Sequence, residues 1–218
     1  MILCSITNSN IAGESGEFAP TMTALARQHR VVALDQRGHG RSTRRTADVF
    51  RDAYMHDVVA LIRHVSPDSR VHLVGQSMGA HTTMLVAAAE PELMESVVLL
   101  EADVGALAFL GGSPIAAAWV KSLELRDGGL WPRFDADIME SCIRHVMKPR
   151  WDEWFSVQAR TLVVYADGGM FTEAQKAAFV SRWPGTLRVD LANGSHDAYL
   201  DQFEAWVDAL RGFLSAPE

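Results

Sequence analysis

Short unbroken runs of apolar residues alternate along the chain with longer segments in which apolar residues recur every three or four positions. The runs are typical of strands buried on both faces, and the longer segments are typical of amphipathic helices. We expect strands at 2–7, 31–34, 71–74, 97–100, 161–166 and 187–191, and helices at 18–28, 52–64, 80–89, 172–183 and 199–214. This alternation predicts an α/β fold with a mostly parallel sheet of about six strands and helices on both faces.

The pattern changes in residues 103–160. This segment has no strand signal, and residues 113–125 and 135–147 have the spacing of helices. We therefore predict a core formed by residues 1–102 and 161–218, interrupted by a helical cap at 103–160.

The composition and net charge of the chain exclude several classes of function. The 218 residues suit a single domain with a sizeable core. A net charge of −7 without a basic stripe argues against a nucleic acid or an anionic membrane as partner. Cys4 and Cys142 suggest neither a disulfide framework nor a metal site, so a reducing cytoplasm is the default. We also see no signal peptide and no apolar stretch long enough to span a bilayer.

The strongest chemical signal is Gly75-Gln76-Ser77-Met78-Gly79, which lies directly between a predicted strand and an Ala-rich predicted helix. In that setting G-x-S-x-G predicts a nucleophile elbow, in which a tight turn exposes the serine hydroxyl. Cβ atoms at Gly75 and Gly79 would crowd the neighbouring backbone. The alternative interpretation is a tight turn that contains a serine by chance.

A serine needs a base to take its proton. His196 follows the last predicted strand and precedes the last helix, which places it at the same edge of the sheet as Ser77. Seven other histidines compete for this role. They lie in predicted helices, inside a strand, in a Gly-rich loop or, for His81, one helical turn after Ser77, where it would support the site from behind.

Three segments together resemble the α/β-hydrolase fold superfamily. They are Asp35-Gln36-Arg37-Gly38-His39-Gly40-Arg41-Ser42, the Ser77 elbow, and Gly194-Ser195-His196-Asp197. The resemblance covers nearly the whole chain except the insertion, which falls where that superfamily places its cap. The superfamily's first two strands have no counterpart here, so either the sheet is reduced or Met1 is internal to a longer reading frame.

The resemblance also implies an acid that orients His196. Most members take it from the loop after the strand at 161–166, where this chain has Asp167. Some dehalogenases and lactone hydrolases of the superfamily place it one strand earlier, and that position here is Glu101. We favour Glu101, followed by Asp167 and then Asp103. A salt bridge at the cap hinge is the alternative role for Glu101.

The oxyanion hole implied by the resemblance combines the backbone N–H of Met78 with one from the loop after the first strand. This loop reads Asn8-Ser9-Asn10, so Ser9 and Asn10 are the candidates. Trp131, Trp151 and Trp154 in the insertion either line an apolar substrate pocket or pack the cap onto the sheet.

The sequence thus predicts a serine hydrolase that cleaves a small apolar ester or lactone through an acyl-enzyme, with no metal or cofactor. A carbon–carbon bond hydrolase, a thioesterase or a biosynthetic cyclase on the same triad remains open. A binding protein without turnover is a further alternative. The sequence also leaves open whether the chain is a monomer or a homodimer.

Overall fold

The computed structural model describes residues 2–7, 15–102, 123–126, 129–132 and 136–216. Within them, six strands form one sheet in the order β2-β1-β3-β4-β7-β8. They are β1 (Ile2–Thr7), β2 (Arg30–Asp35), β3 (Val71–Gln76), β4 (Met94–Leu100), β7 (Arg160–Gly168) and β8 (Thr186–Ser195). Every pairing in this sheet is parallel, which confirms the predicted α/β class and sheet.

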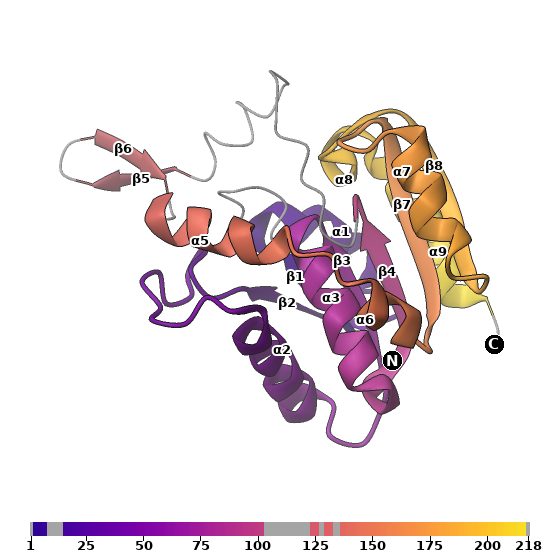
Figure 1. Ribbon diagram of the computed structural model, residues 1–218, viewed down its shortest axis with the longest axis horizontal. Coiled ribbons are helices and arrows are strands. Elements are labelled where there is room, and N and C mark those ends of the chain that lie inside the picture. Colours follow the sequence, from indigo (N-terminus) through magenta and orange to yellow (C-terminus); the bar gives the residue numbers. More distant parts are fainter. Residues whose placement is uncertain (1, 8–14, 103–122, 127–128, 133–135, 217–218) are drawn as a thin grey trace.

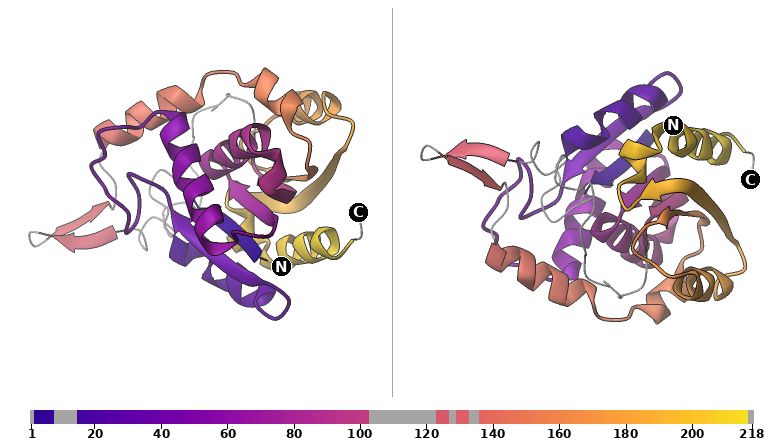
Figure 2. Two further views of the ribbon diagram at one scale, coloured as in Figure 1. Left: turned by 90° about the horizontal axis from the view of Figure 1, so that it is seen from below. Right: turned by 90° about the horizontal axis from the view of Figure 1, so that it is seen from above.

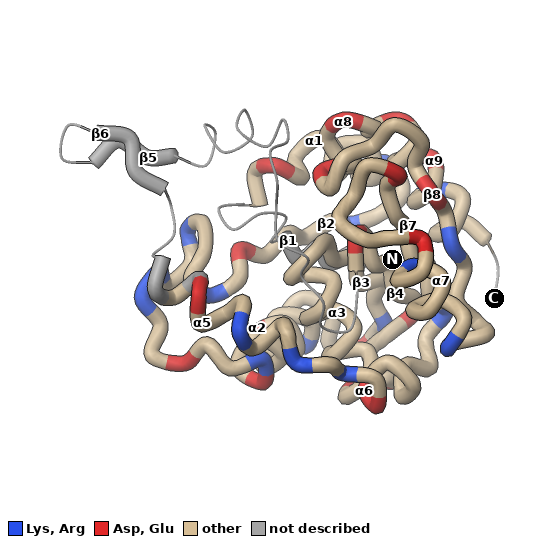
Figure 3. The backbone as a smooth tube through the Cα atoms, turned by 45° about the horizontal axis from the view of Figure 1, so that its top comes forward, with Lys and Arg blue, Asp and Glu red and all other residues tan. Residues whose placement is uncertain are grey.

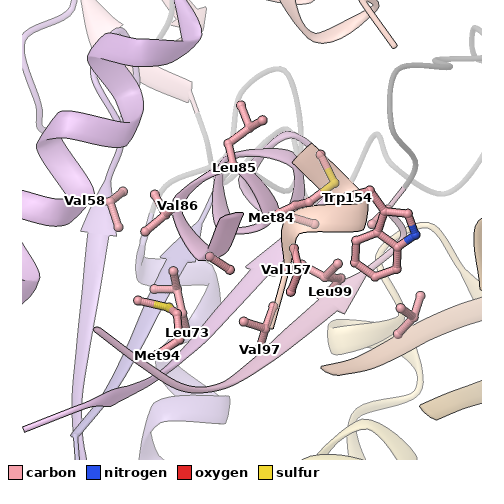
Figure 4. Close-up of a cluster of buried hydrophobic side chains, with 14 of the residues drawn as sticks. Val58, Leu73, Met84, Leu85, Val86, Met94, Val97, Leu99, Trp154 and Val157 are labelled. Atoms are coloured by element: carbon pink, nitrogen blue, oxygen red, sulfur yellow. The ribbon is translucent and has the colours of Figure 1, made fainter. Parts of the chain in front are cut away.

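Two helix layers cover the two faces of the sheet, which explains why its central strands are continuous apolar runs (Figure 1). One layer holds α2 (Arg51–Val65), α3 (Met78–Ala89), α6 (Trp151–Ser156) and α7 (Glu173–Ser181). Its core packs Val58, Leu73 and Trp154 together with the side chains around them (Figure 4). Because both faces of the sheet are covered, β3 is buried along its whole length.

The layer on the opposite face of the sheet brings together helices from the N-terminal and C-terminal parts of the chain. It contains α1 (Ala19–Leu25) and α9 (Phe203–Ser215), which lie side by side (Figure 2). The indole N–H of Trp206 donates to Thr21 Oγ1 at 3.2 Å, and Arg211 donates to the carbonyl of Ala24 at 2.9 Å. Thr21 is therefore the hydrogen-bond partner of a buried tryptophan.

The prediction of an entirely helical insertion is wrong. Strands β5 (Leu123–Arg126) and β6 (Gly129–Pro132) form an antiparallel hairpin, and Arg126 pairs with Gly129. The intervening sequence, Asp127-Gly128, is a strong signal for a two-residue hairpin turn, which the helical interpretation of residues 103–160 overlooks. The predicted helix at 135–147 is present as α5 (Ala136–Val146), and residues 113–122 lie outside the described residues.

Within the described residues, four short helices were not predicted, and α6 is one of them. The expected helix at 199–214 is divided into α8 (Ala198–Asp201) and α9 by Gln202, whose φ is −122°. Short 3-10 helices, η1 (Ser15–Phe18) and η2 (Pro91–Leu93), precede α1 and β4.

The described surface mixes charges of both signs. Lys and Arg are interspersed with Asp and Glu along the described backbone (Figure 3). None of the helices in the described residues combines the length and the apolar character needed to cross a bilayer.

The elbow geometry predicts unequal effects for two Gly→Ala substitutions. A Cβ at position 75 would collide with the carbonyl oxygen of Gly79 and the hydroxyl of Thr83. Gly75→Ala should therefore lower the free energy of unfolding by about 1–3 kcal/mol, measured by urea denaturation. Gly212→Ala is the matched control because a Cβ there meets no atom within 4 Å. In α9 it should be neutral or stabilise by about 0.5–1 kcal/mol. Equal effects of both variants would contradict the crowding at the elbow.

Candidate active site

Ser77 occupies a strained turn between β3 and α3. Its φ and ψ are 52° and −118°, in a region that residues with a side chain rarely adopt. The N–H of Ser77 donates to the carbonyl of Leu100 at 2.9 Å, which ties the turn to the end of β4. The strand, tight turn and helix predicted for the G-x-S-x-G segment are present.

Met78 is the first residue of α3, so its N–H has no partner within the helix and lies at the positive end of the helix dipole. Its side chain packs with Tyr54, Cys142 and Val146, which come from α2 and α5. Ser9 and Asn10, the other oxyanion candidates, lie outside the described residues.

His196 and Glu101 lie together at the carboxyl edge of the sheet. His196 Nδ1 is 3.4 Å from Glu101 Oε2, and the Glu101 side chain is 0% exposed. Two backbone N–H groups, from Ala166 and Met170, also donate to the Glu101 carboxylate, each at 2.8 Å. These two bonds fix the carboxylate in place, while the histidine lies at the long end of hydrogen-bond distance.

Glu101 reaches His196 across the end of an intervening strand. It follows β4, whereas His196 follows β8, and β7 lies between these strands. The backbone of Glu101 turns with a φ of 51°, and its N–H donates to Val164 of β7 at 2.9 Å. A Cβ at Gly169 would collide with the Glu101 carboxylate, so a glycine there leaves the space that this carboxylate fills.

Asp167, the second candidate for the acid, is exposed at the end of β7. The backbone N–H groups of Asn193, Gly168 and Gly194 donate to its carboxylate and hold its pKa below the ordinary value. The bond from Gly168 measures 2.8 Å. Asp167 thus bonds the backbone where β7 and β8 end, whereas Glu101 faces His196. Asp103 lies outside the described residues.

Two of the tryptophans proposed for the substrate pocket pack α6 against α7. The Trp154 ring is stacked on Phe179 with centroids 4.2 Å apart, and its N–H donates to the carbonyl of Phe179 at 3.1 Å. The guanidinium of Arg182 lies 4.1 Å from the centre of the Trp151 ring. Packing therefore accounts for both side chains. Trp131 lies in β6.

Gln76 and Arg51 are two polar residues near the elbow that the sequence pattern did not identify. The amide nitrogen of Gln76 lies 3.2 Å from His196 Nε2 and 3.0 Å from the carbonyl oxygen of His196. Arg51, at the start of α2, donates to the carbonyl of Met78 at 3.4 Å and to Thr82 Oγ1. Burial lowers the pKa of Arg51 to about 10. Gln76 fills a variable position of the G-x-S-x-G motif and Arg51 belongs to no motif, so only the tertiary structure identifies their contacts.

Other histidines are buried in the body of the fold. Burial lowers the pKa of His39 and of His72 to about 4 and that of His81 well below its ordinary value. His39 Nδ1 is bonded to the carbonyl of Arg37, and His72 Nδ1 to the hydroxyl of Ser96. These rings are consequently neutral near pH 7.

The model of a known protein family, described as the alpha/beta hydrolase fold, matches residues 11–137, which is more than half of the chain. The chain belongs to the α/β-hydrolase fold family. The resemblance predicted from the elbow and from the segments around Gly38 and His196 is therefore confirmed.

Individual α/β hydrolases are similar over most of the chain. A 2-(acetamidomethylene)succinate hydrolase from Mesorhizobium japonicum is 28% identical over 86% of this chain and 64% of its own length. The crystal structure of an E-2-(acetamidomethylene)succinate hydrolase covers 99% of this chain and 91% of its own, with a TM-score of 0.81 and 22% identity. An enol-lactonase from Burkholderia xenovorans covers 99% and 91%, with a TM-score of 0.78 and 20% identity.

By their names, the curated relatives hydrolyse different kinds of bond. This chain spans less than two thirds of the length of each of the first three of them. Within the described residues, no group of three His, Cys, Asp or Glu side chains is placed to hold a metal ion.

Because these histidines are buried, we expect the folded protein to lose free energy of unfolding in mild acid. His39 and His72 have pKa values of about 4 when folded, against an ordinary value of 6.5. Between these values the unfolded chain binds more protons, so the free energy of unfolding falls as the pH falls. We expect a loss of about 2 kcal/mol per histidine from about pH 7 to pH 5, measured by urea denaturation. His39→Gln should weaken this pH dependence. Equal stability of the wild type at both pH values would refute the expectation.

Proposed function

We propose that this α/β hydrolase is a serine hydrolase in which Ser77 is the nucleophile, His196 the base and Glu101 the acid that orients the base. The observation that carries the proposal is the buried Glu101–His196 pair, 3.4 Å apart, at the sheet edge where Ser77 occupies its strained turn. Gln76, the residue before Ser77, contacts Nε2 of His196, so the base lies against the elbow.

The proposed reaction is acyl transfer. Ser77 Oγ attacks the substrate carbonyl while His196 Nε2 takes its proton, and Glu101 stabilises the imidazolium that forms. The N–H of Met78, together with a donor from Ser9 or Asn10, holds the oxyanion. His196 then gives its proton to the leaving group. Water activated by His196 releases the acid from Ser77, so the enzyme returns to its starting state.

We propose a carboxylic ester or lactone of an apolar substrate as the bond that is cleaved. The fold is shared with an enol-lactonase, and the acid after β4 resembles the arrangement of lactone hydrolases in the family. An ester is also the easiest of these bonds to cleave, because an alkoxide leaves more easily than an amide nitrogen or a carbanion.

A second candidate is an amide substrate. It is favoured by the relative that aligns with 86% of this chain, which is named as a 2-(acetamidomethylene)succinate hydrolase. The same triad serves this reaction, with His196 protonating a nitrogen instead of an oxygen leaving group.

The test compares Ser77→Ala, Glu101→Gln, Glu101→Asp and Asp167→Asn with the wild type on p-nitrophenyl esters, aryl and macrocyclic lactones and an N-acyl enamine. We expect Ser77→Ala and Glu101→Gln to lose at least about a thousandfold in kcat. Glu101→Asp keeps the charge but shortens the reach across β7, so it should also lose activity. Asp167→Asn is the matched control and should stay near the wild type.

Two outcomes would redirect the proposal. A large loss in Asp167→Asn with an active Glu101→Gln would transfer the role of the acid to Asp167. Turnover of the enamine but of no ester or lactone would favour the second candidate. Gly169→Ala provides an independent check, because its Cβ would displace the Glu101 carboxylate and should reduce kcat.

A further inference from the structure

We propose that Gln76 is a positioning residue that selects the tautomer of His196, an inference that rests on the proposed function of His196 as the base. One side-chain nitrogen of Gln76 makes two contacts with this residue. It lies 3.0 Å from the backbone carbonyl oxygen of His196 and 3.2 Å from the ring nitrogen Nε2. Gln76 is 0% exposed, so water does not compete for these contacts.

The two contacts fix the orientation of the amide. A carbonyl oxygen accepts hydrogen bonds and never donates them, so the Gln76 group that faces the carbonyl of His196 must be the NH₂ end. That end carries two N–H groups, one for each contact. Rotating the amide would bring its oxygen against the His196 carbonyl oxygen, which is repulsive.

The amide in turn fixes the proton on the ring. Because Gln76 donates to Nε2, this nitrogen must present its lone pair, and in a neutral imidazole the proton is then on Nδ1. Nδ1 faces Glu101 Oε2 at 3.4 Å, where it finds an acceptor. Gln76 and Glu101 therefore favour the same tautomer from opposite sides of the ring. This tautomer is the one that accepts the proton of Ser77.

The bond between Gln76 and Nε2 exists only while the ring is neutral. Nε2 has only one lone pair, so the bond from Gln76 must open when Ser77 Oγ–H donates to the same nitrogen. Once Nε2 is protonated, two N–H groups would face each other, so the bond cannot re-form until the proton leaves. The bond to the backbone carbonyl persists, so the loop that carries His196 stays anchored as the ring changes partner. Gln76 thus sets the tautomer of the resting ring before Ser77 engages Nε2, and it holds the backbone throughout the cycle.

Two variants of similar length separate this role from packing. Gln76→Met fills the same space without hydrogen bonds, and we expect it to lower kcat about tenfold. Gln76→Glu carries only acceptors, so it repels the carbonyl of His196 and draws the ring proton to Nε2. We expect it to lower kcat at least about a hundredfold, the range lost when a general base is disabled. KM should stay within about twofold in both variants, because the Gln76 side chain is fully buried and bonds to His196.

The decisive readout is the ¹⁵N spectrum of the His196 ring, assigned by its absence in His196→Ala. We expect wild-type Nδ1 to be protonated and Nε2 to be bare, with the proton transferred to Nε2 in Gln76→Glu. A wild-type ring protonated on Nε2 would overturn the proposal, as would equal activity losses in both variants with the wild-type tautomer retained. If Gln76→Glu does not fold, the wild-type spectrum and Gln76→Met decide the question.

The spectrum also separates this proposal from the proposed function. Labelling of Ser77 by a fluorophosphonate probe reports on the nucleophile alone. A wild type that resists the probe but shows protonated Nδ1 would contradict the serine-hydrolase mechanism and support the Gln76 contact. A labelled wild type with protonated Nε2 would do the reverse.

Discussion

The site depends on a carboxylate that must reach across a strand. Glu101 leaves β4 while its histidine partner leaves β8, so its side chain passes over the end of β7. The extra methylene of glutamate, the left-handed backbone at position 101 and the absence of a side chain at Gly169 all serve this crossing. The N–H groups of Ala166 and Met170 then hold the carboxylate where it arrives.

The same edge of the sheet also positions the elbow. The N–H of Ser77 is bonded to Leu100, the residue directly before Glu101, so the strained turn and the carboxylate share one stretch of β4. Helix α3 is buried from Met78 to Ala87, and this packing prevents the turn from relaxing. The proposed nucleophile and acid are thus fixed by neighbouring backbone groups, whereas the histidine belongs to a separate segment that Gln76 anchors.

Strong local patterns made much of the fold predictable. The central strands of the sheet are continuous apolar runs, whereas β8 alternates apolar residues with Arg188 and Asp190. The elbow combines an apolar run with glycines and an Ala-rich helix, so its position and the family are evident from the sequence. The cap is not. Leu123 and Leu125 alternate with charged residues over only four positions, too short a run to override a helical interpretation. The division of the last helix at Gln202 has no glycine or proline to signal it.

The surroundings of Glu101 were beyond the sequence for a different reason. Glu101 itself can be selected because it ends a strand, but its donors are peptide groups, which every residue except proline carries. The contact between Gln76 and His196 joins residues 120 positions apart and depends on how β3 and β8 are placed. The catalytic roles given to Glu101, Asp167 and the oxyanion loop remain predictions.

The use of peptide groups has a consequence for how this sequence can diverge. Ala166 and Met170 hold the Glu101 carboxylate through their main-chain N–H groups, and Gly169 leaves room for it, so the side chain of Met170 takes no part in that contact. The residue at position 170 can therefore change while these contacts are kept, whereas positions 168 and 169 are constrained, because a Cβ at either would collide with an oxygen atom. With the proposed acid placed after β4, the segment after β7 can exchange outward side chains without moving that carboxylate.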